Sequence, residues 1–199
     1  MVAVLRAAAG RDPYDAITAE AAATPPGAEG LIFLPYLTGE RTPHGSATAR
    51  GVFFGLEPRH GRGHLARAVI EGVSYALRES FGLLRGAGVT ADVVRITGGG
   101  ARSPFWRQVL ADMFECPVAV LPHDEGPAFG AALLAAVGAG AFSSIEEAGL
   151  LIRPGETTAP RAVGSGIYRS GASVYADLYR ALVPLYSERM LLDASHNAV

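Results

Sequence analysis

Three consecutive glycines, Gly98, Gly99 and Gly100, follow a short apolar stretch within the segment VVRITGGGARSPFW. Glycine loses more conformational freedom on folding than any other residue, so such a run needs a specific cause. One cause is a tight turn whose backbone angles other residues avoid. The other is a ligand, such as a flat ring or a sugar, that lies against backbone without a Cβ in the way. The run is longer than a turn needs, which favours the ligand.

The residues after the glycine run favour the start of a helix. Ser103 is a good N-cap, and Pro104 suits the first helical turn, where its missing N–H would have no partner anyway. The glycines are therefore expected between the end of a strand and the start of a helix, at the carboxyl edge of a parallel sheet. Open α/β sheets bind their ligands at this edge.

Comparison with the sequence patterns of known glycine-rich loops excludes one class of nucleotide-binding loop and leaves another open. A dinucleotide-binding loop has the pattern G-x-G-x-x-G, with an acidic residue about 20 positions further on. Gly98 and Gly100 fit this pattern, Ser103 stands at the third glycine position, and Asp124 could serve as the acid on the ribose. A Walker loop needs a lysine after its last glycine, and this run has none. A dinucleotide-binding oxidoreductase domain therefore stays open as an alternative.

No other set of residues predicts a catalytic or metal centre. The histidines are scattered through expected loops and chain ends, have no credible metal spacing, and are expected at the surface: His44, His60, His64, His123 and His196. The single cysteine, Cys116, cannot form an internal disulfide or a cysteine-based metal site, and we expect a buried, inert thiol.

Composition excludes several classes of partner. The 199 residues are 49% hydrophobic and 18% charged, which is typical of a globular protein, and the net charge of −2 argues against nucleic acid or an anionic membrane. The N-terminus shows no signal peptide pattern. The uncharged segment 126–145 is built from Ala and Gly, so we expect a tightly packed buried helix that ends at Gly138 or Gly140, rather than a membrane span.

The first half of the chain predicts two helices joined by a strand and a long loop. Asp12 as N-cap and Pro13 at the first position open a helix that ends at TPPG, and residues 30–37 predict a strand. Residues 38–64 predict an ordered loop that contains one strand. The segment 64–85 is the clearest helix, with one apolar stripe: Leu65, Ala68, Val69, Gly72, Val73, Ala76, Leu77, Ser80, Phe81 and Leu84. Arg67 and Glu71 are four apart and are expected to pair on its solvated face.

The second half alternates strands and helices. Strands are predicted at 92–97 and 117–121, and helices at 103–115 and 126–140; short links between them indicate βαβ units and a parallel sheet. A further helix is expected within 143–152, a loop at 153–166, and a last helix at 167–191. The last helix carries tyrosines at helical spacing, which we expect to pack against the sheet: Tyr168, Tyr175, Tyr179 and Tyr186.

Several segments together resemble one known family. GLIFLPYLTGERTPHGSATARGVFFGL, LARAVIEGVSYALRES, GGGARSPFWRQVLADMF and GPAFGAALLAAVGAGAF are similar to the C-terminal part of FGGY-type carbohydrate kinases, in particular xylulokinases. One family signature is met in full, by Gly51, Phe53, Gly55, Leu56, His64, Leu65, Ala68, Val69, Ile70 and Glu71. The resemblance covers nearly the whole chain and is densest from 27 to 142.

The resemblance implies a fold, a reaction and a ligand. The fold would be α/β: an actin-like, ribonuclease H-like ATPase lobe, incomplete, with a mixed sheet and flanking helices. The reaction would be ATP- and Mg²⁺-dependent phosphorylation of a sugar, most similar to that of D-xylulose, in the cytoplasm. The glycine run would be the adenosine motif, carried onto Gly99, Gly100 and Ala101, with Gly98 before them and Ser103 opening the helix beside them. For the loop residues Glu40, Arg41 and Arg50 the resemblance leaves a direct role toward substrate as an alternative, and buried ion pairs that hold the loop are expected instead.

The resemblance also implies what the chain lacks. In these kinases the sugar site, the phosphate loops and the catalytic aspartate precede the region seen here, and none of Asp92, Asp112 and Asp124 takes the role of general base. Residues 1–199 would form the C-terminal, nucleotide-side lobe without its first strands and without the N-terminal lobe, and would be inactive alone. The partners expected are a nucleotide, a sugar, and either a second copy or a missing N-terminal lobe. The alternative is a non-catalytic ATP-binding or assembly module that works with a separate N-terminal half.

Overall fold

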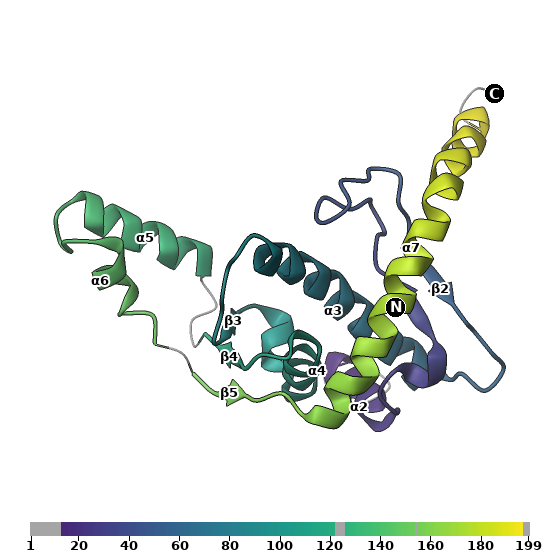
Figure 1. Cartoon of the computed structure of the whole chain (residues 1–199), viewed down its shortest axis with the longest axis horizontal. Coiled ribbons are helices and arrows are strands. Elements are labelled where there is room, and N and C mark those ends of the chain that lie inside the picture. The colour runs from purple at the N-terminus through teal and green to yellow at the C-terminus, as the bar shows by residue number, and fades with distance from the viewer. Residues whose placement is uncertain (1–12, 122–125, 154, 197–199) are drawn as a thin grey trace. The chain divides into compact units, whose positions relative to one another are not determined.

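A computed structural model describes residues 13–121, 126–153 and 155–196 of the chain, which fall into two units (Figure 1). One unit contains the described residues up to Thr90 together with those from Arg161 onward, and the other extends from Ala91 to Pro160. Among the described residues, no helix is both long enough and apolar enough to cross a membrane.

The first unit is a small antiparallel pair of strands packed against helices. Its elements are α2 (Pro13–Ala23), the 3-10 turn η1 (Ala28–Gly30), β1 (Ile32–Leu34), β2 (Val52–Phe54), α3 (Arg62–Gly86) and α7 (Ala162–His196). Strands β1 and β2 are antiparallel with Phe33 opposite Phe53, whose ring centroids are 4.4 Å apart. Leu31 and Ala68 are buried beside Phe33, so the core of this unit lies between β1 and α3. Strand 30–37 and the strand within 38–64 are therefore confirmed in shortened form.

The buried face of α3 differs from the predicted apolar stripe. It consists of Arg67, Ala68, Ile70, Glu71, Gly72, Ser74 and Tyr75. Val69, Leu77 and Leu84, which the stripe included, are exposed. The expected solvated pair of Arg67 and Glu71 is wrong, because both residues are 3% exposed and bond to each other in the core. The helix is oriented by this buried ion pair and by the close approach of Gly72 to β1, rather than by its apolar residues alone.

Helix α7 begins earlier than predicted and packs through its tyrosines. It starts at Ala162 rather than at 167, since the carbonyl of Arg161 accepts from both the N–H and the hydroxyl of Ser165 and so forms the first turn. The four tyrosines named above are buried. Their ring contacts within the first unit are with Tyr75 of α3, with Tyr36 just after β1, and with His44 of the following loop.

The second unit contains the predicted βαβ arrangement. Its elements are β3 (Val94–Ile96), the 3-10 turn η2 (Gly99–Arg102), α4 (Pro104–Phe114), β4 (Val118–Val120), α5 (Gly126–Gly138), α6 (Ile145–Gly149) and β5 (Thr157–Thr158). Strands β3 and β4 are parallel and are joined through α4, which confirms the predicted unit. Helix α4 buries Val109, Leu110 and Met113. Cys116 is a free, buried thiol, as predicted.

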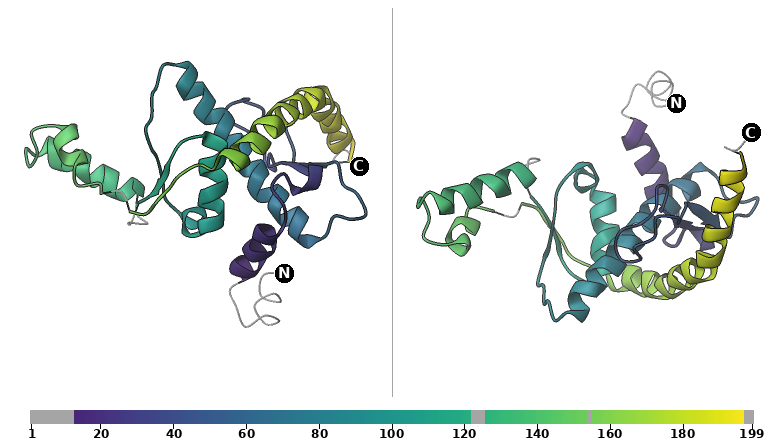
Figure 2. Two further views of the ribbon diagram at one scale, coloured as in Figure 1. Left: turned by 60° about the horizontal axis from the view of Figure 1, so that its bottom comes forward. Right: turned by 90° about the horizontal axis from the view of Figure 1, so that it is seen from above.

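Two predictions for the second unit were wrong. The expected loop 153–166 contains β5, which is antiparallel to β4 and extends the sheet to the order β3-β4-β5. Two β-branched threonines favour this extended backbone, and the N–H of Val120 bonds to the carbonyl of Glu156. Helix α5 ends at Gly138 as predicted, but it is not buried: it packs against α6 (Figure 2), while Leu134 is 58% exposed.

Candidate nucleotide-binding site

The three glycines of the run have different structural causes. Gly98 has φ of 88° and ψ of −174°, a backbone conformation open essentially to glycine alone. A Cβ on Gly100 would lie 2.9 Å from two ring atoms of Trp106, so Gly100 allows the indole to pack against the backbone. At Gly98 and Gly99 an added Cβ would meet no protein atom within 4 Å. The backbone angles of the turn therefore account for Gly98, and the packing of Trp106 accounts for Gly100. No contact among the described residues requires a glycine at position 99.

The start of α4 fixes the backbone that follows the glycines. Ser103 is the N-cap, as predicted, and its hydroxyl accepts a hydrogen bond from the N–H of Trp106 at 3.2 Å. Pro104 occupies the first helical position. The positive end of the helix dipole therefore lies next to the turn η2, a location that favours negatively charged ligand groups.

Arg107 ties this turn to the edge of the sheet. Its Nη1 donates to the carbonyl of Ala101 at 3.0 Å, and its Nη2 lies 2.7 Å from Oε2 of Glu156, just before β5. Ala101 is 4% exposed, so its methyl group faces protein, and Arg107 is 7% exposed. Arg107 was not among the site residues predicted from the sequence; the signal for it was a single charged residue in the first two turns of the predicted helix 103–115.

The predicted site residues lie at the edge of the sheet that was expected for them. The glycine run lies directly after β3 and directly before α4, hence at the carboxyl edge of the parallel pair, as predicted. Gly98 and Gly99 offer bare backbone, whereas Ala101 can contribute only backbone because its side chain is buried. The structure brings Gly98, Gly99, Gly100, Ala101 and Ser103 together in one turn, and their role in binding stays a prediction.

The family of the chain follows from comparison with known proteins. The sequence profile of the FGGY family of carbohydrate kinases, C-terminal domain, matches residues 2–139, a range that contains the glycine run and all of α4. The chain belongs to the FGGY family.

Curated relatives of this FGGY chain include sugar kinases of more than one kind. Xylulose kinase from Staphylococcus epidermidis is 40% identical over 182 residues, which are 91% of this chain and 37% of that protein. Xylulose kinase from Escherichia coli K12 is 42% identical over 159 residues, 79% of this chain and 33% of that protein. Gluconokinase from Bacillus licheniformis is 39% identical over 181 residues, 90% of this chain and 35% of that protein. The chain spans about a third of the length of these relatives, from 33% to 37%.

Solved structures give the same fold. Xylulose kinase from Lactobacillus acidophilus matches with a TM-score of 0.83 and 30% identity, over 94% of this chain and 38% of that chain. Gluconate kinase from the same organism matches with a TM-score of 0.83 and 31% identity, over 90% of this chain and 36% of that chain. The predicted fold class, part of an actin-like ATPase lobe with mixed sheet and flanking helices, is confirmed.

The acidic residues of the FGGY chain are not arranged for phosphoryl transfer in the described region. Asp112 is fully buried in α4, where its Oδ1 accepts from Nε2 of Gln108 at 2.8 Å. Asp92 is exposed, ahead of β3, and Asp124 lies outside the described residues. The described residues contain no group of three or more His, Cys, Asp or Glu side chains able to hold a metal ion.

His44, His60 and His64 were expected at the surface, and all three are half-buried. His44 stacks on Tyr179 with ring centroids 3.6 Å apart, and its Nε2 lies 3.1 Å from the hydroxyl of Tyr36 and 3.2 Å from Oε2 of Glu79. The hydroxyl of Tyr175 donates to that of Tyr36 at 2.9 Å. Burial raises the pKa of the Glu79 carboxyl, and the nearby His44 opposes this. This cluster joins the loop after β1 to α3 and α7.

The loop residues Glu40 and Arg50 are held by local hydrogen bonds instead of the expected buried ion pairs. Oε1 of Glu40 accepts from the N–H of Thr42 at 2.8 Å, and Nη1 of Arg50 donates to the carbonyls of Ala47 and Ala49. Arg41 is exposed. His44 of the same loop lies 3.2 Å from Oε2 of Glu79 in α3.

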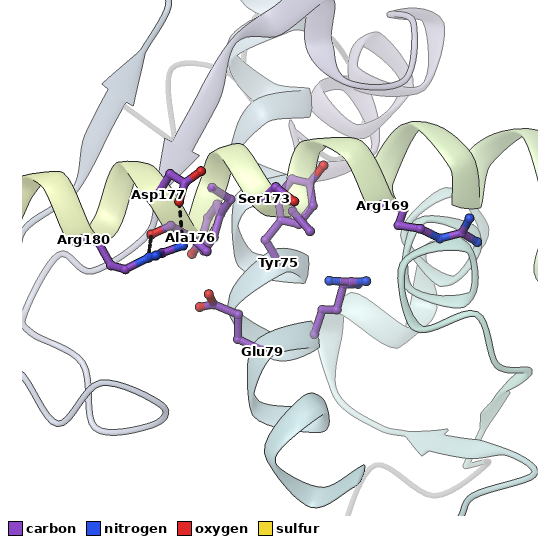
Figure 3. Close-up of a pocket in the computed structure, with 10 residues that line it drawn as sticks. Tyr75, Glu79, Arg169, Ser173, Ala176, Asp177 and Arg180 are labelled. Atoms are coloured by element: carbon purple, nitrogen blue, oxygen red, sulfur yellow. Dashed lines mark hydrogen bonds and ion pairs between the residues drawn. The ribbon is translucent and has the colours of Figure 1, made fainter. Parts of the chain in front are cut away.

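A cavity of about 470 Å³ lies between α3 and α7 in the first unit (Figure 3), outside the unit that carries the glycine run. In Figure 3, Tyr75 and Glu79 come from α3, whereas Arg169, Ser173, Asp177 and Arg180 come from α7. Three arginines and two carboxylates line it: Arg78, Arg169, Arg180, Glu79 and Asp177. Arg180 lies 2.5 Å from Oδ1 of Asp177, and Oε2 of Glu79 lies 3.2 Å from Nε2 of His44.

Proposed function

We propose that this chain supplies the adenosine-binding part of an ATP-dependent sugar kinase, and that residues 1–199 form the C-terminal lobe of that enzyme without its first strands. The observation that carries the proposal is the bare backbone at Gly98 and Gly99, at the carboxyl edge of the parallel strands, in a chain of the FGGY family. An adenine ring or a ribose would lie against this backbone, where a side chain would otherwise stand.

The chain's own residues would hold the nucleotide rather than move its phosphate. The turn η2 would present the backbone of Gly99, Gly100 and Ala101, and Arg107 would keep that turn in place through the carbonyl of Ala101. Phosphoryl transfer needs a carboxylate within hydrogen-bond reach of the acceptor hydroxyl, and that group would come from the rest of the enzyme. ATP with Mg²⁺ would supply the transferred phosphoryl group.

For the sugar, D-xylulose with xylulose 5-phosphate as product has the best support. Relatives at 40% and 42% identity carry the name xylulose kinase, and solved xylulose kinases match the fold. Gluconokinases match at nearly the same identity, so the sugar is to be assayed with gluconate as comparison. The reaction would take place in the cytoplasm, and the isolated chain would not carry it out.

A titration with ADP tests the nucleotide site directly. Trp106 is the only tryptophan of the chain and packs against Gly100, so bound ADP should change its fluorescence. We expect saturable binding of ADP and weaker binding of NAD. Stronger binding of NAD would support the dinucleotide-binding oxidoreductase domain instead and would contradict the kinase assignment.

A matched pair of glycine variants locates the site. Gly99→Val places a side chain in the open space beside the run and should weaken ADP binding without lowering thermal stability, since an added Cβ meets no protein atom within 4 Å. Gly82→Ala, in an equally open position on α3, should leave ADP binding unchanged. Equal affinities of both variants and the native chain would show that the run is only a turn.

The second candidate function is a non-catalytic ATP-binding or assembly module that works with a separate N-terminal half. It is favoured by the length of the relatives, of which the chain spans 37% in the Staphylococcus epidermidis protein. Assays of xylulose phosphorylation, with and without the N-terminal part of that relative, separate the two. Activity gained on mixing supports a kinase made of two parts, and nucleotide binding without activity in the mixture supports the module.

A further inference from the structure

The cavity between α3 and α7 exists because α7 presents small side chains to it. Ala172, Ser173 and Ala176 line it, with Arg169 before them and Arg180 after them in the sequence. The steps from one arginine to the other through Ser173 and Ala176 are three or four residues, so these side chains share one face of α7. Packed helix axes lie about 8–10 Å apart, and side chains as short as alanine and serine do not fill that space. The α7 side of the cavity is therefore small in its middle and cationic toward both ends.

The charged groups around the cavity leave an excess of positive charge, since its lining contains three arginines and two carboxylates. Asp177 is paired with Arg180, and Glu79 lies next to His44, so both carboxylates already have a partner. Arg169 lies eight residues before Asp177, about 12 Å along the helix axis, which exceeds the Debye length of about 8 Å at physiological salt. Figure 3 shows the two arginines of α7 well apart along the helix. The cavity therefore favours an anion, and the guanidinium fork matches a phosphate group through two parallel hydrogen bonds.

The size and polarity of the cavity fit a small organic phosphate better than inorganic phosphate. Its volume of about 470 Å³ lies within the range of about 300–1,000 Å³ that is typical of small-molecule sites. A water molecule occupies about 30 Å³ in the liquid, so the cavity has room for several times the volume of one phosphate group. The carboxylates of Glu79 and Asp177 accept hydrogen bonds, and the hydroxyl of Ser173 both donates and accepts. Hydroxyl groups on the same ligand as the phosphate would therefore find partners.

The aromatic residues of the cavity argue against a nucleotide base as part of the ligand. Tyr75 is 5% exposed and Tyr175 is 0% exposed, and their ring centroids are 5.1 Å apart. A base stacks on an open aromatic face, and neither of these buried rings offers one. The glycine run, for which we propose a nucleotide, belongs to the other unit.

We propose that this cavity binds a small sugar phosphate, with its phosphate group on Arg78 and Arg169 and its hydroxyl groups on Ser173 and the two carboxylates. It is a second small-molecule site of the chain, and it does not depend on the proposed nucleotide site. Because Glu79 lines the cavity and also lies next to His44, the bound ligand would adjoin the link between α3 and the loop after β1.

Isothermal titration calorimetry of the full chain with ribose 5-phosphate tests this site, with ribose and inorganic phosphate as comparisons. We expect saturable binding of ribose 5-phosphate at a single site. Ribose lacks the phosphate group and should not bind. Inorganic phosphate lacks the hydroxyl groups and should bind roughly tenfold more weakly, because the hydrogen bonds to charged carboxylates are lost.

Four variants make the outcome specific. Arg78→Gln and Arg169→Gln should each weaken binding roughly tenfold, because each removes a charged hydrogen bond to the phosphate. Asp177→Asn should strengthen binding about threefold, since it removes a negative charge from the lining and keeps an acceptor oxygen. Arg85→Gln makes the same change of net charge at an exposed position near the end of α3 and should leave binding unchanged. Circular dichroism checks the folding of each variant, and the exposed position of Arg169 keeps the test decisive should Arg78→Gln fail to fold.

Saturable binding of ribose 5-phosphate that Arg169→Gln weakens and Asp177→Asn strengthens supports the site. Absence of saturable binding, weakening by Arg85→Gln as large as that by Arg169→Gln, or a decrease in Asp177→Asn would overturn it. Equally tight binding of inorganic phosphate would also overturn it and would indicate an adventitious ion only. Gly99→Val should bind ribose 5-phosphate as the native chain does, and loss of binding in that variant would place the ligand at the glycine run instead. Failure of ADP to bind while ribose 5-phosphate still binds contradicts only the proposed nucleotide site.

Discussion

Gly72 of α3 lies directly against the carbonyl oxygen of Phe33 in β1: an added Cβ on Gly72 would come within 2.1 Å of that oxygen. Backbone therefore meets backbone at this crossing, and only a residue without a side chain allows it. The approach brings Phe33 and Ala68 into the core of the first unit. The position of α3 on β1 is thus set by one glycine.

Gly72→Ala should destabilise the chain by about 3 kcal/mol or prevent folding, because neither the strand carbonyl nor the helix backbone can yield cheaply. Gly82→Ala is the matched control on the same helix: its added Cβ meets nothing within 4 Å. That change should stabilise by about 0.5–1 kcal/mol through helix propensity. Thermal and urea unfolding measure the stability of both variants. Equal effects of the two substitutions would contradict the close backbone contact between Gly72 and Phe33.

The sequence correctly predicted that α3 is a helix, but not which of its residues are buried. Its apolar residues recur at helical spacing, which was sufficient to locate the helix. The buried face could not be predicted, because Arg67 is buried only through partners distant in sequence: the carbonyls of Ala21 and Thr24 and the hydroxyl of Tyr168. A pattern of residue types along one helix contains no information about such partners.

Glu71→Gln should destabilise the first unit by about 3–5 kcal/mol, because it leaves the guanidinium of Arg67 buried without its counter-charge. Oε1 of Glu71 accepts from Nε of Arg67 at 2.7 Å, from the N–H of Gly27 at 3.0 Å and from the hydroxyl of Tyr168 at 2.9 Å. Denaturant unfolding measures the loss.

Two controls accompany this substitution. Arg62→Met removes an exposed ion pair with Glu20 and should leave the denaturant concentration at the midpoint of unfolding unchanged. The double change Arg67→Met with Glu71→Met should recover part of the stability that Glu71→Gln loses, since no charge then remains buried. A double variant less stable than Glu71→Gln would show that the hydrogen bonds of this cluster, rather than its charge balance, dominate.

The glycine run was predicted more completely, for a physical reason. Its signals are local: a strand, the positive-φ requirement of Gly98, the cap of Ser103 and Pro104 are all contained within a few residues, and the structure shows each of them. For α5, in contrast, the sequence-based prediction of burial was wrong. Its composition predicted burial, and whether a helix is buried depends on which other elements pack against it, here α6.

Ser103→Ala should cost about 1 kcal/mol of stability, because the N–H of Trp106 loses its acceptor at the start of α4. Ser103→Asp should retain most of that stability, since an aspartate caps equally well. The control is Ser170→Ala inside α7, where alanine is the better helix former and the midpoint should not fall. Calorimetry measures the unfolding of all three variants. A loss of stability in Ser170→Ala as large as that in Ser103→Ala would contradict helix capping as the cause.

Glu79 should make the first unit less stable as the pH rises. Burial raises the pKa of its carboxyl above the ordinary value of 4.5, so the folded chain holds this proton more tightly than the unfolded chain does. Protonation therefore contributes stability below pH 4.5, and this contribution is lost as the pH rises through the higher folded pKa. Glu79→Gln cannot ionise, and its stability relative to the native chain should increase across that interval. Urea unfolding in steps from pH 4 to pH 8 measures the difference, and a relative decrease for Glu79→Gln with rising pH would show that His44 outweighs burial at this carboxyl.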